Sequence, residues 1–463
     1  MKSANRRNFM KVLGVVGGTS LVGAGTAAAN SDEHHDHGHK SNTQTGQCQC
    51  LTDDPFVGTW TASVVPPGME GYSRTGFEDQ TLRFIVRADT AGSEVRIRLS
   101  NTFGDRPVTF DHAEIGFQDE DAAVVPGTNT LLTFGGEQEV MIPAGAMVYS
   151  DPVSLSVEPG RYLTVSLYTQ DDTGPATWHP LGIETSYLAG GDDAGDVSGD
   201  PYTKELFSYY FLEGVDVLPK EKTEGAIVTL GNSITDGFQL SQMPEQDNPY
   251  PYYLAQRIND HSDVDRTVLN TGISGNRILS DSGTAGTNAL ARLNRDVIAQ
   301  PGVTDVIILE GINDIGYQEP DVTAQQIIQG LKQIAIRCHA HGLDIYAGTL
   351  TPTRGTGGGY SSPTAEAKRE MVNEFIRTGE YFDGVFDFDT AIQDPDQPDR
   401  ILPKFDSGDH LHPSNAGYRK MAEIIDLSLF KNECQEKHAK KHHGQGHDHG
   451  HGSSPKKVGT PSD

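Results

Sequence analysis

Apolar and polar residues alternate with a period of two along the first half of the chain. The alternation recurs in short runs from about residue 54 to 218, among them Leu82/Phe84/Val86, Val95/Ile97/Leu99 and Leu163/Val165/Leu167. Successive side chains of a strand point to opposite faces, so each run indicates a strand. Turns rich in Gly, Pro and Asp separate the runs, without a helix-length amphipathic segment. The pattern predicts an antiparallel β-sandwich domain over residues 51–218.

After a short link at 220–225, apolar runs alternate with amphipathic segments of helix length. The expected strands are 226–230, 267–270, 305–309, 344–350 and 385–388, and the expected helices are 250–259, 289–299, 323–341, 364–379 and 414–430. This alternation predicts an α/β domain over residues 224–432, with a parallel sheet covered by helices on both sides. Sheets of this kind bind ligands at the carboxyl ends of their strands.

The last expected helix has a clear apolar face. That face is formed by Tyr418, Met421, Ala422, Ile425 and Leu429. These positions are consistent with one amphipathic helix over residues 414–430.

The N-terminus carries a pattern typical of an export signal. Arg6 and Arg7 precede a mildly apolar stretch that ends in three alanines at 27–29, as in a twin-arginine signal with a small-residue cleavage site. A membrane anchor is the alternative, but the stretch is short and rich in glycine. We expect residues 1–29 to be a signal peptide and the mature protein to be secreted.

Both ends of the mature chain are polar and rich in histidine. Residues 30–50 contain EHHDHGHK and residues 433–463 contain KHHGQGHDHGHG. Neither segment has enough apolar surface to fold alone, so we expect disordered tails. The functional alternative is loose binding of Zn, Cu or Ni by neutral imidazoles. An engineered tag is less favoured, because Asp and Gly interrupt the runs.

The four cysteines are too few for a disulfide scaffold in 463 residues. Cys48 and Cys50 precede the first domain and Cys434 follows the last, so a bridge from this pair to Cys434 could join the two ends. Cys338 falls in an expected helix, where a small buried apolar role is expected.

The chain is strongly acidic. It has 36 Lys and Arg against 64 Asp and Glu, a net charge of -28. Such a field repels nucleic acid phosphates and anionic lipid surfaces, so we expect no nucleic acid partner and no membrane insertion. The acidity is dispersed along the chain, which fits a protein kept soluble in high salt by hydrated carboxylates.

Ser233 follows the first strand of the expected parallel sheet, within TLGNSITDGF. Gly231 and Gly237 permit a sharp turn on either side of it. At the carboxyl edge of an open sheet, such a serine is a candidate nucleophile. Ser and Asn also occupy ordinary surface turns, so this stretch alone does not establish a site.

A second stretch, DSGDHLHPSNAGY, supplies the base that a serine nucleophile needs. Asp409 and His412 are three residues apart, so one short loop offers an imidazole and the carboxylate that orients it. His410 and Asp406 are rivals for these roles. His412 is preferred, since His410 adjoins Asp409 and tends to point to the opposite side of an extended segment. Asp406 is explained equally well as a turn residue.

Two further loops could stabilise an oxyanion formed by attack on an acyl carbon. Gly275 follows the second strand and could present a backbone N–H, and Asn313 follows the third and could offer its side-chain amide. Together with Ser233, they would surround one point at the sheet edge.

The four stretches that carry these candidate residues, called blocks below, resemble the conserved blocks of the SGNH hydrolases, also called the GDSL esterases and lipases. The resemblance covers residues 224–430 through TLGNSITDG, GISGN, LEGINDIG and DHLH, in that order. It implies a flavodoxin-like three-layer fold with Ser233 as nucleophile and oxyanion donor, Gly275 and Asn313 as further donors, His412 as base and Asp409 as its orienting acid. Asn232 departs from the pattern, because the family usually has Asp there.

The first domain is similar to the jelly-roll-like sandwich that precedes the hydrolase domain in a secreted subgroup of the family. FVGTWTAS, QTLRFIVRADTAGSEVRIRLSNTFG and TSYLAGGD carry this resemblance. Members of the subgroup are linked to deacetylation of plant cell-wall polysaccharides, which implies an acylated carbohydrate substrate.

The sequence lacks the motifs of several other kinds of site. The glycine cluster at 355–360 has no following Lys-Ser/Thr for a phosphate loop, so we expect it to form the rim of the site. No His-Glu-x-x-His stretch and no Gly-x-Ser-x-Gly elbow occur, so we expect no catalytic metal, no cofactor and no α/β-hydrolase fold.

The sequence therefore predicts a secreted serine esterase that cleaves O-acyl esters, foremost O-acetyl esters. A lipase or short-chain carboxylesterase is the nearest alternative. A catalytically silent surface protein that binds glycans or metal is the alternative of another class.

Overall fold

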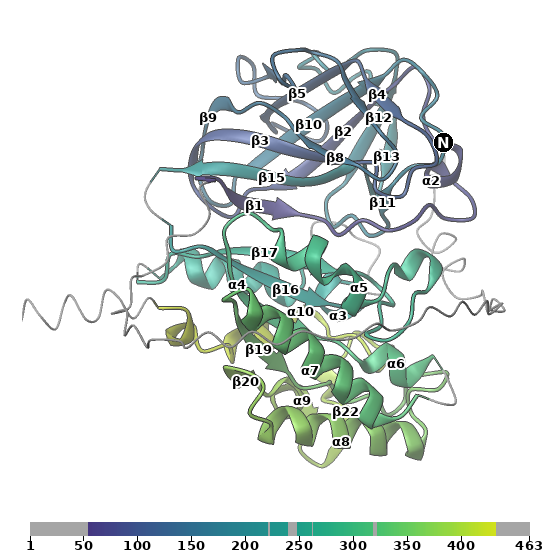
Figure 1. Ribbon diagram of the computed structural model, residues 1–463, viewed down its shortest axis with the longest axis vertical. Helices are drawn as coiled ribbons and strands as arrows, with labels where there is room; N and C mark the ends of the chain where they lie inside the picture. The colour runs from purple at the N-terminus through teal and green to yellow at the C-terminus, as the bar shows by residue number, and fades with distance from the viewer. Residues whose placement is uncertain (1–53, 221–222, 239–247, 262, 318–321, 432–463) are drawn as a thin grey trace, which may run out of the picture.

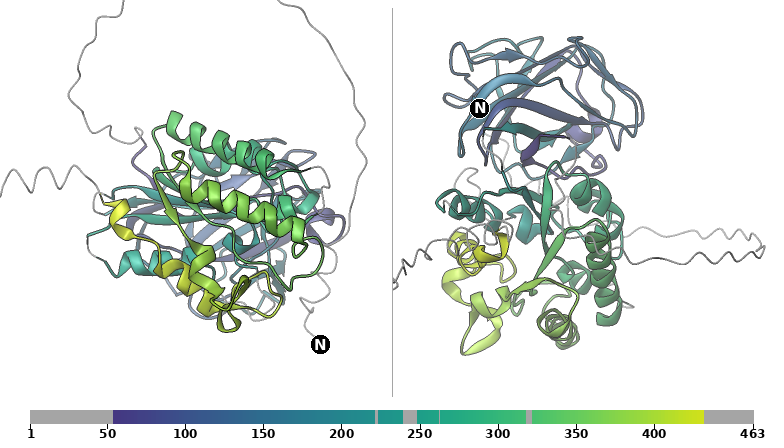
Figure 2. Two further views of the ribbon diagram at one scale, coloured as in Figure 1. Left: turned by 90° about the horizontal axis from the view of Figure 1, so that it is seen from below. Right: turned by 60° about the vertical axis from the view of Figure 1, so that its left-hand side comes forward.

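A computed structural model describes residues 54–220, 223–238, 248–261, 263–317 and 322–431 (Figure 1). The expected signal peptide, both histidine-rich tails and Cys48, Cys50 and Cys434 lie outside these residues. Two bodies lie one above the other in Figure 1 and in the right-hand view of Figure 2. We call residues 54–219 the β half and residues 224–431 the α/β half.

Two antiparallel sheets build the β half. The first has the order β1-β15-β3-β8, with β9 also paired to β3, and the second has the order β13-β12-β2-β10-β5-β6. The strands of the first sheet are β1 Val57–Thr61, β3 Gly92–Ser100, β8 Met147–Tyr149, β9 Val153–Val157 and β15 Leu212–Pro219. Those of the second are β2 Gln80–Arg87, β5 His112–Phe117, β6 Thr130–Leu131, β10 Tyr162–Thr169, β12 Ser186–Gly190 and β13 Lys204–Leu206.

Smaller elements complete this half. They are helix α2 Tyr72–Thr75 and the strand pairs β4 Val108–Phe110 with β7 Val140–Ile142, and β11 Trp178–His179 with β14 Tyr209–Tyr210.

The apolar positions of the period-two pattern meet in one core. Leu82, Phe84 and Val86 of β2 lie opposite Leu167, Val165 and Leu163 of β10, and all six belong to a cluster that includes Val95, Ile97 and Leu99 of β3. Both sheets therefore bury a face in a shared core, as a sandwich requires.

The polar side of β2 and β10 is buried as well. Arg83 is 0% exposed and donates to Ser166 Oγ and to the carbonyl oxygens of Ala122 and Asp196. The alternation in the sequence predicts that one face of each strand is buried. In the structure, loops that include Ala122 and Asp196 also cover the polar face around Arg83.

The α/β half has a five-stranded sheet, ordered β17-β16-β18-β19-β20, in which every pairing is parallel. Its strands are β16 Ala226–Gly231, β17 Thr267–Gly272, β18 Val303–Leu309, β19 Asp344–Gly348 and β20 Gly384–Phe386. This strand order is the flavodoxin-like one. The expected parallel α/β fold is confirmed.

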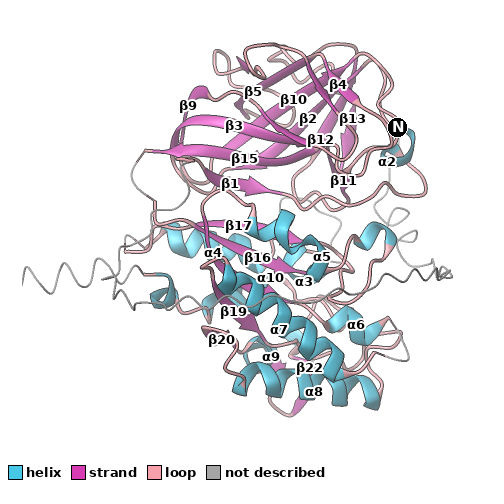
Figure 3. Ribbon diagram, in the orientation of Figure 1, coloured by secondary structure: helices cyan, strands magenta, loops and turns pink. Residues whose placement is uncertain are grey.

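Helices lie on both sides of the sheet (Figure 3). They are α3 Ser233–Asp236, α4 Tyr250–Asn259, α5 Ala289–Leu293, α6 Ile312–Gly316, α7 Ala324–Ala340, α8 Pro363–Thr378, α9 Phe388–Ile392 and α10 Asn415–Glu423. The half also contains a π-helix at Asn294–Ile298 and short 3-10 helices at Gly283–Ala285, Pro403–Phe405 and Leu427–Phe430. A hairpin pairs β21 Gln393–Asp394 with β22 Gln397–Ile401. In the part of the chain that the structure describes, none of the helices has the length and apolar character needed to cross a membrane.

The last helix is shorter than expected. It ends at Glu423, and the Asp426 side chain then accepts the Ser428 N–H and caps a 3-10 turn. The change of helix type rotates the following residues, so Leu429 is 39% exposed and Phe430 is buried in its place. The expected helix over 414–430 is therefore too long, and Leu429 does not share the buried face of Tyr418 and Met421.

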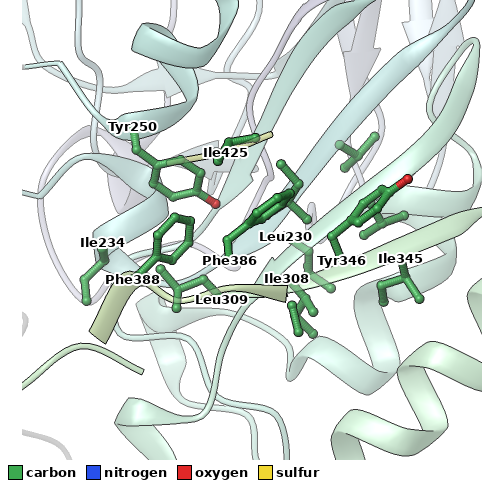
Figure 4. Packing of buried hydrophobic residues seen from close by; sticks show 14 of the residues in the cluster. Leu230, Ile234, Tyr250, Ile308, Leu309, Ile345, Tyr346, Phe386, Phe388 and Ile425 are labelled. Atoms are coloured by element: carbon green, nitrogen blue, oxygen red, sulfur yellow. The ribbon is translucent and has the colours of Figure 1, made fainter. Parts of the chain in front are cut away.

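The core of the α/β half lies between the sheet and these helices (Figure 4). It includes Leu230, Ile308 and Ile345 from adjacent strands and the rings of Tyr250, Tyr346, Phe386 and Phe388. Cys338 of α7 is free and fully buried, as expected for a small apolar group. This core fixes the strands whose carboxyl ends carry the site.

The two halves meet along β1 and β17, which lie side by side (Figure 1). Gly58 of β1 donates its N–H to Pro301 O at 3.0 Å, and a Cβ there would come within 2.8 Å of the Leu269 side chain. Arg98 of β3, which is 2% exposed, donates to Gln300 Oε1 at 3.0 Å. Backbone and side-chain bonds therefore connect the halves.

Candidate active site

Ser233 is the first residue of α3, and only Asn232 separates it from the end of β16. Asn232 caps this helix, since its Oδ1 accepts a backbone N–H of α3 at 3.1 Å and its Nδ2 donates to Leu309 O at 3.2 Å. A Cβ at Gly231 would lie 1.9 Å from the Thr235 hydroxyl oxygen, so only glycine fits this turn. The turn holds the serine at the carboxyl edge of the sheet.

Asn232, which replaces the usual Asp of the resembling family, suits its surroundings. Its Nδ2 lies 3.4 Å from Oε2 of Glu310, and burial raises the pKa of Glu310 to about 8. A carboxylate at position 232 could not donate to Leu309 O and would adjoin a second buried carboxyl. Asparagine both caps the helix and bonds across to β18.

Ser233, His412 and Asp409 form a continuous hydrogen-bonded path. Ser233 Oγ lies 2.8 Å from His412 Nε2, and His412 Nδ1 lies 2.6 Å from Asp409 Oδ2. Ser233 is 7% exposed and His412 is 6% exposed. The loop before α10 thus brings the imidazole to a serine that is 179 residues away in the chain.

The surroundings of Asp409 stabilise its ionised form. Its Oδ1 accepts the N–H groups of Leu411 and His412, at 2.9 and 2.8 Å, and the Ser407 hydroxyl at 3.2 Å. Burial opposes ionisation, but the hydrogen bonds from the His412 side chain and from the backbone N–H groups of His412 and Leu411 outweigh it and hold the pKa of Asp409 well below its usual range. An ionised carboxylate only accepts, so Nδ1 of His412 carries a hydrogen and Nε2 is left to accept from Ser233.

The rival pair lies in the same loop but turns away from the serine. His410 Nδ1 contacts Asp406 Oδ2 at 2.6 Å, and the His410 side chain is 48% exposed. His410 has a φ of 65°, a left-handed conformation, which directs its side chain differently from that of His412. The structure thus brings His412 to Ser233 and pairs His410 with Asp406 outside the site.

Gly275 and Asn313 lie on the same pocket as Ser233. Gly275 has a φ of 81°, and its N–H has no acceptor among the described residues. Asn313 donates through Nδ2 to Asn276 O at 2.9 Å, which leaves its second N–H available. Together with the N–H of Ser233, these two groups supply three donors for a carbonyl oxygen held against the serine.

Tyr360 orients the Asn313 amide, a role that the sequence did not indicate. Its hydroxyl donates to Asn313 Oδ1 at 2.7 Å. With the Asn276 carbonyl on the other side, this bond fixes which end of the amide is nitrogen. Tyr360 ends the glycine cluster that we expected at the rim, and it does line the pocket.

Arg292 joins the strand ends beneath the site. It is 1% exposed and donates to Asn276 Oδ1, Thr271 O and Gly231 O at 2.9, 2.7 and 3.0 Å, and to Asp296 at 3.0 Å. It therefore ties the nucleophile turn to the glycine loop. In the sequence it is one basic residue in an expected helix, with no motif to mark it.

The pocket at this site has a volume of about 220 Å³. Phe238, Ala285 and Leu411 contribute apolar surface, and Ser274, Ser282, Thr284 and Tyr317 complete the lining. The described residues contain no group of three or more His, Cys, Asp or Glu side chains arranged to hold a metal ion.

Comparison with known proteins found one family model and several solved structures that are similar to part of the chain. Residues 229–420 match the model of the GDSL-like lipase/acylhydrolase family, and this segment contains all four blocks. An acetylxylan esterase from Geobacillus stearothermophilus is 21% identical, with 45% of this chain and 94% of that chain covered and a TM-score of 0.35. An aryl esterase from M. smegmatis and a carbohydrate acetylesterase from Sinorhizobium meliloti are each 16% identical, with 43% of this chain and 96% of theirs covered and TM-scores of 0.35. No curated protein sequence matches the chain.

Proposed function

Because residues 229–420 belong to the GDSL-like lipase/acylhydrolase family, whose members are hydrolases of the SGNH type, we propose that this enzyme is a secreted serine esterase acting on O-acetyl esters of polysaccharides. The observation that carries the proposal is the path from Ser233 through His412 to Asp409, which opens on a pocket with oxyanion donors.

In the proposed reaction, Ser233 Oγ attacks the ester carbonyl carbon while His412 Nε2 takes the hydroxyl proton. The resulting oxyanion faces the N–H groups of Ser233 and Gly275 and the amide of Asn313. Asp409 stabilises the imidazolium. The carbon–oxygen bond to the alcohol then breaks, and His412 gives its proton to the departing alkoxide.

Deacylation repeats these steps with water. His412 removes a proton from water, the hydroxide attacks the acyl carbon, and the oxyanion forms again at the same donors. Collapse of this intermediate breaks the bond to Ser233 Oγ, which recovers its proton from His412. The acid product leaves and the free enzyme is restored.

The size of the pocket supports a short acyl group. Its volume of about 220 Å³ is below the range of roughly 300–1,000 Å³ that is typical of pockets for drug-sized ligands. An acetyl group fits such a space, whereas most of a long acyl chain would remain in water. The twin-arginine pattern and the resemblance of the β half to the sandwich of secreted deacetylases support a polymeric substrate outside the cell.

The test is acetate release from acetylated xylan and pectin fragments, with p-nitrophenyl esters of increasing length, at high and low salt. Ser233→Ala should reduce kcat by about 10⁴-fold or more. Ser428→Ala removes an exposed serine hydroxyl of the α/β half that lies outside this pocket, and it should leave kcat within about twofold.

Two results would refute the proposal. Preference for long-chain esters over acetyl esters would identify a lipase or a general carboxylesterase. A wild type that binds glycans or metal but hydrolyses none of these esters would identify the silent binding protein.

A further inference from the structure

A buried histidine of the β half contacts the nucleophile helix of the α/β half. His179 of β11 is 5% exposed, and its Nε2 lies 3.1 Å from Oδ1 of Asp236, the last residue of α3. Its Nδ1 lies 2.7 Å from Ser63 O. A carbonyl and a carboxylate both accept, so both ring nitrogens must carry hydrogens for the two bonds to form.

The charge of His179 agrees with this geometry. Burial opposes protonation, but the carboxylate of Asp236 and the acceptor at Ser63 outweigh it and raise the pKa of His179 above its ordinary value. A buried imidazolium thus faces a carboxylate that is itself 4% exposed. Removal of the histidine would leave that carboxylate without its partner from the β half.

The other oxygen of the same carboxylate holds the glycine loop. Asp236 Oδ2 accepts the backbone N–H of Ser274 at 2.7 Å and the Ser274 hydroxyl at 2.6 Å. The Ser274 carbonyl and the Gly275 N–H belong to one peptide unit. Anchoring Ser274 at two atoms therefore restricts the direction in which that N–H points.

A second contact supports the same part of the site. Ser63, whose carbonyl accepts from His179, donates through its hydroxyl to Thr271 O at 3.3 Å. Thr271 lies near the end of β17, just before the glycine loop. The β half thus contacts this loop both at its origin and, through Asp236, at Ser274.

We infer that His179 is a positioning residue of the esterase, which orients the oxyanion donor Gly275 through Asp236 and Ser274. The inference rests on the proposed function. It gives the β half a part in transition-state stabilisation, separate from any contact that this half makes with substrate. The consequence is specific: loss of His179 should weaken binding of the oxyanion more than binding of the ester.

The experiment compares His179→Leu with His179→Gln in the full chain. Leucine removes both donors, whereas the glutamine amide can still donate to Asp236. Complete loss of an oxyanion donor costs about 10²–10³ in kcat, so a misdirected donor should cost about 10- to 100-fold. We expect that loss in His179→Leu, with KM within about twofold, and recovery of most of kcat in His179→Gln.

Inhibition separates positioning from general disruption. Methylboronic acid forms a tetrahedral adduct with a nucleophilic serine and places an oxygen at the oxyanion donors, whereas acetate is a product with a planar carboxylate. In His179→Leu the inhibition constant for methylboronic acid should rise by the same factor as kcat falls, and that for acetate should stay within about twofold.

Gln300→Leu is the matched control. It breaks another polar bond between the halves, the one from Arg98, at the opposite end of the parallel strands. It should lower the melting temperature and leave kcat unchanged. Ser274→Ala is a milder substitution, because Ser274 is partly exposed and keeps its backbone bond to Asp236. Loss of the hydroxyl bond to Asp236 should lower kcat by about 3- to 10-fold.

The inference would be overturned if His179→Leu kept the wild-type kcat and the wild-type inhibition constant for methylboronic acid. It would also be overturned if the inhibition constants for acetate and methylboronic acid rose by the same factor. These outcomes differ from failure of the proposed function, in which the wild type itself would not hydrolyse the esters or Ser233→Ala would remain active.

Discussion

The bond from Tyr360 to Asn313 allows the orientation of an oxyanion donor to be tested apart from its presence. Tyr360→Phe removes one oxygen atom and leaves the ring in the pocket wall. Asn313 then keeps its bond to Asn276 O but loses the donor that holds Oδ1 in place. The amide can flip more readily, and a flipped amide presents oxygen to the oxyanion.

The structure sets the expected size of this effect. One neutral hydrogen bond contributes about 0.5–1.5 kcal/mol, and 1.36 kcal/mol corresponds to a tenfold change in rate. Because Asn276 O still opposes the flip, Tyr360→Phe should lower kcat by about 2- to 12-fold. Asn313→Ala removes the donor altogether and should lower kcat by about 10²–10³.

The assay is steady-state hydrolysis of p-nitrophenyl acetate, with kcat and KM determined separately. Both variants should lower kcat more than they change KM, because the donor acts mainly on the transition state. Tyr346→Phe is the control, since it also removes a tyrosine hydroxyl that donates to a carbonyl, Leu429 O at 3.2 Å, but away from the site. It should cost about 1 kcal/mol of stability and leave kcat unchanged.

Two outcomes would refute this reasoning. A loss in Tyr360→Phe as large as that in Asn313→Ala would show that the tyrosine hydroxyl is itself a transition-state donor. Unchanged kcat in Asn313→Ala would show that the amide does not face the oxyanion.

Three further predictions concern stability and the loops beneath the site. Arg292→Met should lower the free energy of unfolding by about 3–5 kcal/mol in urea titrations, because its buried acceptors would lose their donor; a loss below about 1 kcal/mol would contradict the bonds described. The buried carboxyl of Glu310, with its pKa raised from 4.5 to about 8, binds its proton more tightly in the folded state, so the wild type should lose stability as pH rises across this window. At about 1.36 kcal/mol per pKa unit, this shift corresponds to a loss of unfolding free energy on the order of 5 kcal/mol between low and high pH. Glu310→Gln should remove most of this pH dependence, and parallel curves of stability against pH for the two proteins would disprove the assignment. Gly275→Ala should cost about 1–2 kcal/mol in thermal unfolding and lower kcat, since its φ is 81° and the new Cβ would lie 3.0 Å from Ala285 Cβ; wild-type values of both would contradict it.

Local patterns in the sequence determined most of the fold. The expected helix at 250–259 coincides with α4, because its amphipathic period and flanking residues are local properties. The apolar pattern continues through Leu429 and predicts a last helix that is too long, because the cap at Asp426 starts a separate 3-10 turn. Arg83 and Arg98 occupy polar positions of the period-two pattern, yet both are buried, because loops bond to Arg83 and Gln300 of the α/β half bonds to Arg98.

The order of the strands, the helices and the four sequence blocks follows from the sequence alone. The carboxyl ends of parallel strands share one edge, so this order already predicted that Ser233, Gly275 and Asn313 would lie close together. It also supplied both histidines of the last loop as candidate bases. These conclusions depend on spacing along the chain, which the sequence states directly.

The contacts that hold this edge of the sheet in place depend on the three-dimensional fold. The φ of His410 turns one histidine outward and leaves His412 on the serine. Tyr360 reaches Asn313 across 47 residues, and His179 reaches Asp236 across 57. Hydrogen bonds between such distant positions depend on how whole helices and strands pack. Packing of this kind produces no periodic pattern in the sequence, so these contacts could not be predicted from it.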